Sequence, residues 1–459
     1  MPKSQYHLVC GLEIHLELNT ASKMFCGCAN DPFHTSLPNS HTCPVCLGMP
    51  GGLPVPNKKA IEWTIKLGLF LGCQINLFSK FDRKNYFYPD LPKGYQISQY
   101  DLPFCYGGQI ETDAGPVGIE RIHLEEDAGK LIHAQIDGEK VSLVDFNRSG
   151  VPLVEIVTKP DIKTAAQAVA FAKKLRAAIR YLGIGNGDME KGEMRLEANI
   201  SLQTDSELQC NQLPSYKVEV KNINSFNFMQ QAIEFEVARQ SQLLAEGQEI
   251  KQETRGFNNV KQITFPQRSK GNAADYRYFP DPDIPSIVFN EEQINQWRQE
   301  LPPSQTTTAK KWAEEFALSS VESSYFLENR ALADFAATLW VEAVKNNATH
   351  ERQIDITQLA KMMINKKIAW QVDDLPDTII HRFLSATEVT SLDEEEIKVI
   401  ITQILKENQA AVNKYHQGQK SIIGFFIGEA KHHLGPKADI KQLKSLIENQ
   451  LLGLSAPPL

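Results

Sequence analysis

The chain has 459 residues, 56 of them acidic and 48 basic, so its net charge at pH 7 is −8. This acidity argues against a protein that coats nucleic acid without specificity, and an apolar share of 42% excludes a largely disordered chain. No apolar run approaches the ~18 residues that a membrane span needs. The first residues enter a strand pattern directly instead of forming a secretory signal, so we expect a cytoplasmic protein.

The first predicted element is a strand over residues 8–18, in which apolar and polar side chains alternate with a period of two. The apolar set faces a core, and Glu13, His15 and Glu17 lie in line on the other face. Acids that flank a histidine, with no basic residue beside them, are unusual on a merely solvated strand. Residues 8–18 are therefore the first candidate for a site.

Two close pairs of cysteines follow this strand, Cys26 with Cys28 and Cys43 with Cys46. Such pairs across a loop are typical of a tetrahedral Zn²⁺ site. Four thiolates leave no position for a substrate, so the predicted role of zinc is structural; the alternative is four unrelated reduced thiols. The remaining cysteines are isolated and are interpreted as small buried hydrophobic residues: Cys10, Cys73, Cys105 and Cys210.

Three further strands are predicted over 117–126, 194–202 and 216–221, and each has a polar face of its own. These faces carry Arg121, His123 and Glu125, then Arg195, Glu197, Asn199 and Ser201, then Lys217, Glu219 and Lys221. If these strands and residues 8–18 belong to one sheet, one face of that sheet carries histidine, carboxylate, arginine and lysine side chains. That face is either a solvated surface with cross-strand ion pairs or a divalent metal site. The pattern leaves both open, and a histidine ligand leaves the identity of the metal open as well.

Helices are predicted over 164–183 and 229–247, and nearly all of the chain beyond residue 302 has helical periodicity. The first helix begins with the capping-box pair Thr164 and Gln167. The composition changes once more near the end, where an acidic segment gives way to residues 402–459, with seven lysines against four acids. This shift predicts a linker in the 390s and a mildly basic last domain.

Familiar phosphate-binding and nucleophile motifs are missing. Gly129-Lys130 lacks the earlier glycine of a P-loop, and the chain has no G-x-S-x-G or H-E-x-x-H pattern. Aromatic residues alternate with Arg and Lys in segments 81–90 and 275–280. Such loops suit the single-stranded end of a nucleic acid, whose bases stack on rings, although buried aromatics that pin a loop give the same pattern.

Seven stretches, taken together, resemble the B subunit of the tRNA-dependent amidotransferase GatCAB. They are residues 11–15, 79–90, 96–100, 123–130, 145–150, 221–226 and 275–280. The match to the family runs in order through residues 6–290. Beyond residue 300 the resemblance depends on the helical periodicity and on residues 424–428 in a YqeY-like tail. The archaeal GatE relatives carry an inserted synthetase-like domain, for which this chain has no room, so GatB is favoured.

The resemblance implies a ligase that works in two steps on a misacylated tRNA. ATP phosphorylates the side-chain carboxylate of Glu on tRNA(Gln) or of Asp on tRNA(Asn), and ammonia then displaces the phosphate. Because the transferring phosphoryl group needs its charge neutralised, Mg²⁺ is the implied cofactor beside ATP and structural Zn²⁺. The implied partners are an amidase-type A subunit, which releases ammonia from glutamine, a small C subunit, and the tRNA, with no membrane.

The resemblance also implies an α+β fold in three parts. A cradle domain over residues 1–295, built on an antiparallel sheet with helices, would contain the zinc loop 26–46 and the kinase and transamidase chemistry. An all-α domain over 296–395 and the YqeY-like tail over 396–459 would follow.

The motifs of the family imply which residues act. The expected catalytic residues are Glu13, His15, Glu125 and Glu126. The expected Mg²⁺ ligands are Glu13, His15, Glu125, Glu197 and Glu253, and the expected ATP contacts are Lys80, Lys130, Glu253 and Arg277. The alternative is a non-catalytic, tRNA-binding scaffold subunit of the same complex, against which the alignment of acids and histidine argues. The sequence leaves open which tRNA is the substrate.

Overall fold

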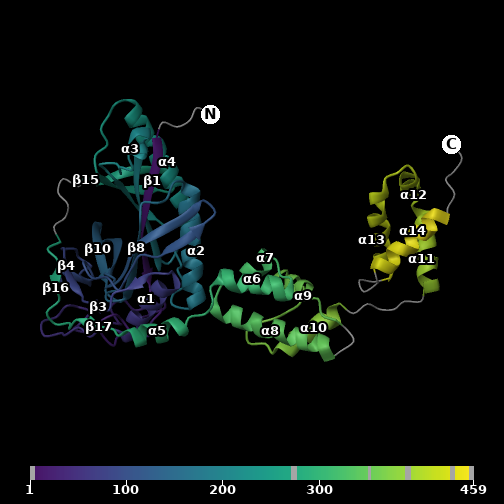
Figure 1. Cartoon of the computed structure of the whole chain (residues 1–459), viewed down its shortest axis with the longest axis horizontal. Coiled ribbons are helices and arrows are strands. Elements are labelled where there is room, and N and C mark those ends of the chain that lie inside the picture. The colour runs from purple at the N-terminus through teal and green to yellow at the C-terminus, as the bar shows by residue number, and fades with distance from the viewer. Residues whose placement is uncertain (1–5, 270–275, 350–352, 388–393, 435–439, 454–459) are drawn as a thin grey trace. The chain divides into compact units, whose positions relative to one another are not determined.

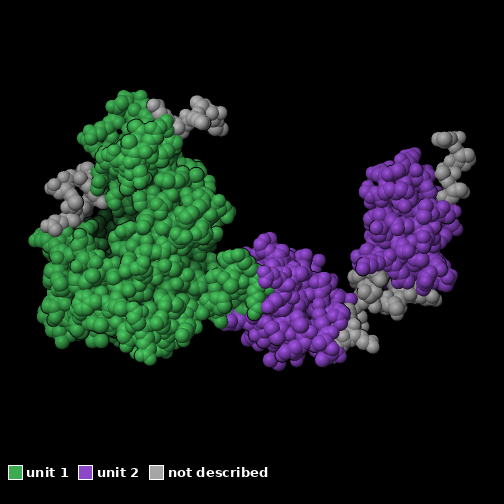
Figure 2. Space-filling view, in the orientation of Figure 1, with its two compact units in different colours: residues 1–311, 326–333 green, residues 312–325, 334–459 purple. Residues whose placement is uncertain are grey.

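The computed structural model describes residues 6–269, 276–349, 353–387, 394–434 and 440–453. The chain divides into two compact units (Figures 1 and 2), residues 1–311 with 326–333 and residues 312–325 with 334–459. All strands of the described ranges belong to the first unit, whereas the described part of the second is helical.

The first unit is built on a ten-stranded sheet with the order β15-β14-β13-β12-β1-β11-β8-β6-β2, in which β7 also pairs with β8. Neighbouring strands are antiparallel except β13 and β14, which run parallel. The bounds are β1 Tyr6–Glu17, β2 Gln74–Ile75, β6 Cys105–Tyr106, β7 Gln109–Thr112, β8 Gly115–Glu126, β11 Pro152–Thr158, β12 Met194–Thr204, β13 Val218–Ile223, β14 Glu253–Asn258 and β15 Ile263–Ser269. The predicted strands are therefore present, each within a few residues of its expected ends.

The core lies between the apolar face of this sheet and its helices. Helix α2 (Ala165–Leu182) packs beside α4 (Phe226–Ala245), and both contribute fully buried side chains, such as Phe171 and Met229. Ile14 of β1 is also fully buried. Burial of such side chains supplies about 1.5–3 kcal/mol each relative to exposure, which holds the sheet rigid beneath its polar face.

Helix α2 begins with only half of the predicted capping box. Thr164 accepts a hydrogen bond from the backbone N–H of Gln167 at 3.1 Å, as expected. The Gln167 side chain, however, accepts from the backbone N–H of Lys163 at 2.8 Å instead of from Thr164. The helix ends at Gly183, whose φ of 68° is in the left-handed region that glycine adopts freely.

Three smaller sheets surround the main one. The hairpin of β9 (Lys130–Ile136) and β10 (Glu139–Asp145) turns through Asp137 and Gly138, both at positive φ, as its two-residue turn requires. The other strands are β3 Phe78–Ser79, β4 Asp82–Asn85, β5 Tyr95–Ser98, β16 Phe279–Pro280 and β17 Ile287–Val288, in the orders β16-β4-β5 and β17-β3.

The remaining secondary-structure elements of the described residues are helices. The bounds are α1 Lys58–Phe70, α3 Asp205–Gln209, α5 Glu291–Gln299, α6 Gln305–Phe316, α7 Ser320–Phe326, α8 Arg330–Thr349, α9 Ile356–Ile364, α10 Pro376–Ala386, α11 Glu394–Glu407, α12 Gln409–His416, the 3₁₀ turn Lys420–Ile422, α13 Ile423–Leu434 and α14 Ile440–Gly453. Helices α11 to α14 have a core of their own, centred on the fully buried Ile401, Phe426 and Leu443. None of the described helices combines the length and apolar character needed to span a membrane.

The predicted α+β fold is confirmed, with the mixed sheet first and helices after it. Two smaller predictions, the burial of Cys210 and the linker in the 390s, are not confirmed. Cys210, predicted to be buried, is exposed because it follows the short surface helix α3. The predicted linker in the 390s falls partly on residues 388–393, which lie outside the described residues.

Candidate active site and metal centres

The register of the sheet brings a row of ionisable side chains together on its polar face. In β11, Glu155 lies directly opposite His15 of β1 on one side and His123 of β8 on the other. Glu13 lies two residues before His15 on β1 and Glu125 two residues after His123 on β8, so both share this face. We call Glu13, His15, His123, Glu125 and Glu155 the carboxylate–histidine cluster.

His123, Glu125 and Glu155 are buried and Glu13 and His15 are half-buried, and the contacts among the five do not satisfy all of their polar atoms. The Nε2 atom of His15 is 3.5 Å from a Glu155 oxygen and 3.8 Å from one of Glu125. The Nε2 atom of His123 is 3.4 Å from Glu155 and 3.7 Å from Glu125. Apart from the 3.4 and 3.5 Å contacts with Glu155, these separations exceed hydrogen-bonding distance, and all are longer than a charge-assisted hydrogen bond, about 2.7–2.9 Å. The groups therefore surround a space that a cation could occupy.

The pKa shifts show how negative this space is. Burial would lower the pKa of His123, but the carboxylates of Glu155 and Glu125 raise it to about 9. Burial raises the pKa of Glu13, and the nearby charges of Glu155 and Glu197 raise it further. Histidines that hold protons so strongly mark a potential that favours any cation, a metal ion included.

The donor set fits a divalent cation. Glu13, His15 and Glu155 form one group, and His123, Glu125 and Glu155 form another, each with possible ligand atoms within 4.8 Å of one another. The Nε2 atom of His123 faces the carboxylates of Glu125 and Glu155, whereas its Nδ1 atom is buried with no hydrogen-bond partner among the described residues. Carboxylates suit Mg²⁺ and Mn²⁺, whereas two imidazoles suit softer ions, so the set accepts more than one metal.

Glu197 lies one strand further along this face. It is opposite Glu13 in the register and forms a carboxylate group with Glu13 and Glu219. Lys221 donates to Glu197 at 2.7 Å and is 3.6 Å from Glu219. This lysine already neutralises part of the charge, so the group is a weaker cation trap than the cluster beside it.

The structure does not bring all the sequence-predicted residues to this face. Glu126 follows Glu125 and so points the other way; it forms an ion pair with Lys93 and accepts the backbone N–H of Ile97 at 3.0 Å. Glu253 lies on the helix side, where it is 2.9 Å from Arg255 and 3.5 Å from Arg239.

The predicted ATP contacts lie on surrounding loops and strands. Lys80 pairs with Asp82 and, at 2.6 Å, with Asp101. Lys130 is an exposed residue at the start of the β9–β10 hairpin. Arg277 is exposed at a φ of 43°, and its carbonyl accepts from Asn85.

An aromatic cluster stands beside the carboxylates, from segments that are distant in the sequence. The rings of Tyr100 and Tyr278 stack with centroids 4.3 Å apart, and the Tyr86 ring meets the edge of Tyr276 at 6.1 Å. The ammonium of Lys84 lies 5.1 Å from the centroid of Tyr276. Burial would lower the pKa of Lys84, but the nearby Glu125, Tyr278 and Glu155 hold it above its ordinary value.

Sequence reasoning missed Glu155, the residue that joins both histidines. Its strand, β11, is almost entirely buried on both faces and has no polar alternation. The sequence feature that could have revealed Glu155 is a single carboxylate within an apolar run, because an unpaired acid rarely occupies such a position. His123 and Lys84 lay within the quoted motifs but were not assigned roles.

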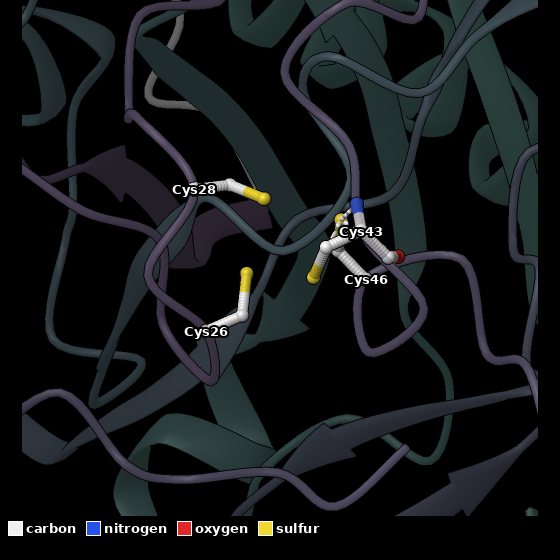
Figure 3. Close-up of side chains that lie close together, drawn as sticks. All are labelled: Cys26, Cys28, Cys43 and Cys46. Carbon is white, nitrogen blue, oxygen red and sulfur yellow. Dashed lines mark hydrogen bonds between the residues drawn. The ribbon is translucent and has the colours of Figure 1, made fainter. Parts of the chain in front are cut away.

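The four predicted zinc ligands also come together. Cys26, Cys28, Cys43 and Cys46 place their sulfurs within 4.8 Å of one another, and Figure 3 shows the two pairs facing each other across a gap. A Zn–S distance of about 2.3 Å in a tetrahedron separates sulfurs by about 3.8 Å, so the cluster fits a four-coordinate metal. Hydrogen bonding from Cys26 lowers the pKa of Cys46 to about 5, and Lys23 reaches the Cys46 sulfur at 3.7 Å.

Comparisons with known proteins agree with this geometry. Residues 8–295 match the model of the GatB/GatE catalytic domain, and residues 339–451 match a GatB domain. The chain is 38% identical to the B subunit of the aspartyl/glutamyl-tRNA(Asn/Gln) amidotransferase of Crocosphaera subtropica, over 98% of this chain and 99% of that protein. It is 39% identical to the protein of the same name from Thermotoga maritima, over 98% and 100% of the two chains. The chain therefore belongs to the GatB/GatE family, as the sequence motifs predict.

Proposed function

We propose that this protein is the subunit of an aminoacyl-tRNA amidotransferase that activates and amidates the side-chain carboxylate of Glu-tRNA(Gln), of Asp-tRNA(Asn), or of both. The observation that carries the proposal is the carboxylate–histidine cluster, largely buried on the polar face of the sheet in the region that matches the family's catalytic domain. The names of the relatives, which match this chain over nearly its whole length, support the same reaction.

In the first step, a carboxylate oxygen of the tRNA-bound Glu or Asp attacks the γ-phosphorus of ATP. A new O–P bond forms while the bond to the β–γ bridging oxygen breaks, and ADP leaves with that electron pair. Glu13, His15, Glu125 and Glu155 would hold a Mg²⁺ ion, which would neutralise charge on the phosphate oxygens. Glu125 and Glu155 keep the pKa of Lys84 high, so its ammonium stays charged next to the cluster. There it would pair with an oxygen of the transferring phosphoryl group.

In the second step, ammonia attacks the acyl carbon of the phosphorylated side chain. The C–N bond forms, phosphate leaves with the electrons of the C–O bond, and a proton of the nitrogen passes to the departing phosphate. Oxide is a very poor leaving group and phosphate a good one, so the first step makes the second possible. The cluster would therefore act on the first step, by stabilising the phosphoryl transfer, and amidation would depend on that step.

The remaining site residues have supporting roles in this proposal. The rings of Tyr86, Tyr100, Tyr276 and Tyr278 would stack the unpaired bases at the tRNA end. Lys80, Lys130 and Arg277 stay predictions as nucleotide contacts. Glu126, Glu197 and Glu253 are weaker candidates than Glu155, because each has a close ion pair with a lysine or arginine, whereas Arg121 stays 3.5 Å from Glu155.

The four-cysteine cluster would hold one Zn²⁺ as a structural ion. Four thiolates fill a tetrahedral shell, so the ion would tie the two cysteine pairs together without contacting substrate. Lys23, which is fully buried, donates to the carbonyls of His41 and Phe146 and to Cys46, and so ties this loop to the segment that follows β10.

The relatives' designation as one subunit of an enzyme implies a complex. We propose that a glutamine-hydrolysing A subunit supplies the ammonia and that a small C subunit joins both in a cytoplasmic heterotrimer. We also propose a division into residues 1–295, 296–395 and 396–459, with the last part binding the body of the tRNA. A run of its basic side chains comprises Lys431, His432, His433, Lys437, Lys441 and Lys444, of which Lys437 lies outside the described residues.

The test is ADP formation that depends on charged tRNA, measured in the assembled complex with Glu125→Gln. Because this carboxylate would hold the metal, we expect a loss of about 100-fold or more. Glu120→Gln is the matched control, since Glu120 is an exposed acid of the same strand. Hydrolysis of glutamine by the partner should persist in both variants.

Normal ADP turnover in Glu125→Gln would contradict the proposal. It would favour instead a subunit that only binds tRNA, an interpretation that the buried cluster and the family's catalytic domain do not favour.

A further inference from the structure

Strand β11, which carries Glu155, has a sequence that does not fix its own register. It begins at Pro152, opposite Glu126 at the end of β8, and Glu155 consequently lies opposite His123. All but one of its seven residues are buried, so no polar side alternates with an apolar one. Because register is normally set by such alternation or by a turn, some other feature must hold β11 in place.

Two alternative registers show why this matters for the cluster. A slip of one residue would turn Glu155 toward the apolar face of the sheet, where an unpaired carboxylate is costly. A slip of two residues in one direction would keep it on the polar face but place it opposite Arg121 instead of His123. Cross-strand pairs of opposite charge are favourable, so the strands alone do not exclude this second register.

The pairing of β8 with β11 continues one step beyond the two strands. The backbone N–H of Asp127 donates to the carbonyl of Val151 at 2.8 Å, and the N–H of Gly150 donates to the carbonyl of Asp127 at 2.9 Å. Gly150 has a φ of 84°, in the left-handed region that glycine adopts freely, and the chain turns into β11 there. The segments that leave β8 and enter β11 are thus neighbours.

Arg148 fastens these two segments to each other. Its Nε atom donates to the carbonyl of Ala128 at 3.1 Å and its Nη2 atom to that of Gly129 at 2.7 Å. Its Nε atom also lies 3.7 Å from the carboxylate of Asp127. Because a guanidinium is a rigid planar fork, two donors on consecutive carbonyls define one position of the arginine along the chain that leaves β8.

The loop of the four cysteines holds the residues on both sides of Arg148. The hydroxyl of Ser149 donates to the carbonyl of Cys46 at 2.9 Å. The side chain of Asn147 accepts the backbone N–H of His41 at 2.8 Å. The backbone that carries the arginine is therefore anchored on one side, while its side chain grips the end of β8 on the other.

We infer that Arg148 is a positioning residue, which fixes the register of β11 against β8 and thereby keeps Glu155 between the two histidines. The inference rests on the proposed function, in which Glu155 holds a metal ion, and gives a part in it to a residue outside the cluster. A purely structural arginine would stabilise the chain without deciding which residues of β8 and β11 face each other.

The experiment compares the full-length wild type with Arg148→Ala by two measurements, Mn²⁺ binding and amide hydrogen exchange. Mn²⁺ should bind the variant at least about tenfold more weakly, because residues that orient metal ligands change affinity by about 10- to 100-fold. Exchange should become faster in residues 121–127 and 151–158. Added guanidinium ion should reverse both changes, since it can donate to the same two carbonyls.

Arg148→Lys is the second variant, and it carries both measurements if Arg148→Ala does not fold. It retains the positive charge but not the fork, so its Mn²⁺ binding should stay weaker than that of the wild type. Arg180→Ala is the matched control. Arg180 also donates to a backbone carbonyl, that of Asn186 at 2.6 Å, but from helix α2. It should leave Mn²⁺ affinity and exchange in β8 and β11 unchanged.

Wild-type Mn²⁺ affinity in a folded Arg148→Ala would overturn the inference. So would a loss of stability to urea without faster exchange in β8 and β11, which is the result of a merely structural role. Full Mn²⁺ affinity in Arg148→Lys would also contradict it, because charge and not the fork would then matter. A wild type that binds no Mn²⁺ would instead refute the metal site of the proposed function, and the exchange measurement would still decide whether Arg148 fixes the register.

Discussion

Glu155 and Glu236 are buried carboxylates on opposite faces of one sheet, and their surroundings differ in a way that separates function from structure. Glu236, on α4, accepts from Arg239 at 3.0 and 2.8 Å and from Gln240 at 3.0 Å. It also lies 3.1 Å from Arg255 and hydrogen-bonds Thr264. Every lone pair that burial removes from water is replaced by a protein donor.

Glu155 has no such set of donors. Its neighbours are His15 and His123 at 3.5 and 3.4 Å, and Arg121 at 3.5 Å from the margin of the face. A closed network of donors leaves no room for a ligand and serves the fold. An open cluster of carboxylates and histidines costs stability unless a cation fills it. The difference in partners, not in burial, marks the site.

The four cysteines form a third kind of cluster, in which a bound metal ion would satisfy every ligand. Removing one of these ligands should have the largest effect on stability. Zinc-finger peptides gain about 10–16 kcal/mol from such an ion, so Cys43→Ser should lower the free energy of unfolding by several kcal/mol. Metal analysis together with thermal unfolding is the measurement. Cys210→Ser, at an exposed thiol, should behave as the wild type. One zinc retained per chain with unchanged unfolding in Cys43→Ser would contradict the four-ligand site.

Glu236→Gln should produce the next largest effect, and it should be confined to stability. Removing this charge leaves Arg239 and Arg255 without their main partner, although Glu253 remains 3.5 and 2.9 Å from them. Breaking a buried ion pair costs about 3 kcal/mol or more. Urea unfolding measures the loss, and ADP formation per folded molecule should stay unchanged. A loss of activity without a loss of stability would place Glu236 in the chemistry instead.

The pH dependence of stability gives a smaller but more specific effect. Burial would raise the pKa of Glu236, but hydrogen bonds from Arg239, Thr264 and Gln240 hold it below its ordinary value of 4.5. The unfolded chain therefore binds this proton more readily, so the stabilisation is complete well above pH 4.5 and is lost as the pH falls. The stability difference between wild type and Glu236→Gln should thus narrow in acid. A difference that stays constant from about pH 7 to pH 3 would contradict this assignment.

Part of this organisation could be predicted from the sequence. Alternation along residues 8–18 and 117–126 placed Glu13, His15 and Glu125 on polar faces, and the spacing of the cysteines predicted their cluster. Strand order and register could not be predicted, because they depend on pairings between distant segments. Glu155 remained hidden because its strand is buried on both faces and lacks a polar period.

Glu253, which was expected among the metal ligands but lies on the helix side of the sheet, was misplaced for a different reason. In the short strand β14, Glu253 lies opposite Val218 of β13, whose side chain is fully buried beneath the sheet. The neighbouring Thr254 is the residue that reaches the polar face, where it donates to Glu219 at 2.7 Å. A shift of one residue in register exchanges the two faces, and no apolar alternation in this strand fixes the register in advance.

Binding of Mn²⁺ to wild type, Glu155→Gln and Glu236→Gln, followed by electron paramagnetic resonance, tests most directly whether the open cluster is the cation site. Mn²⁺ is spectroscopically visible and prefers carboxylate over thiolate ligands, so it reports on the cluster and not on the cysteines. We predict that Glu236→Gln binds the ion as the wild type does, whereas Glu155→Gln binds it at least about tenfold more weakly. Equal affinity in all three proteins would contradict the assignment.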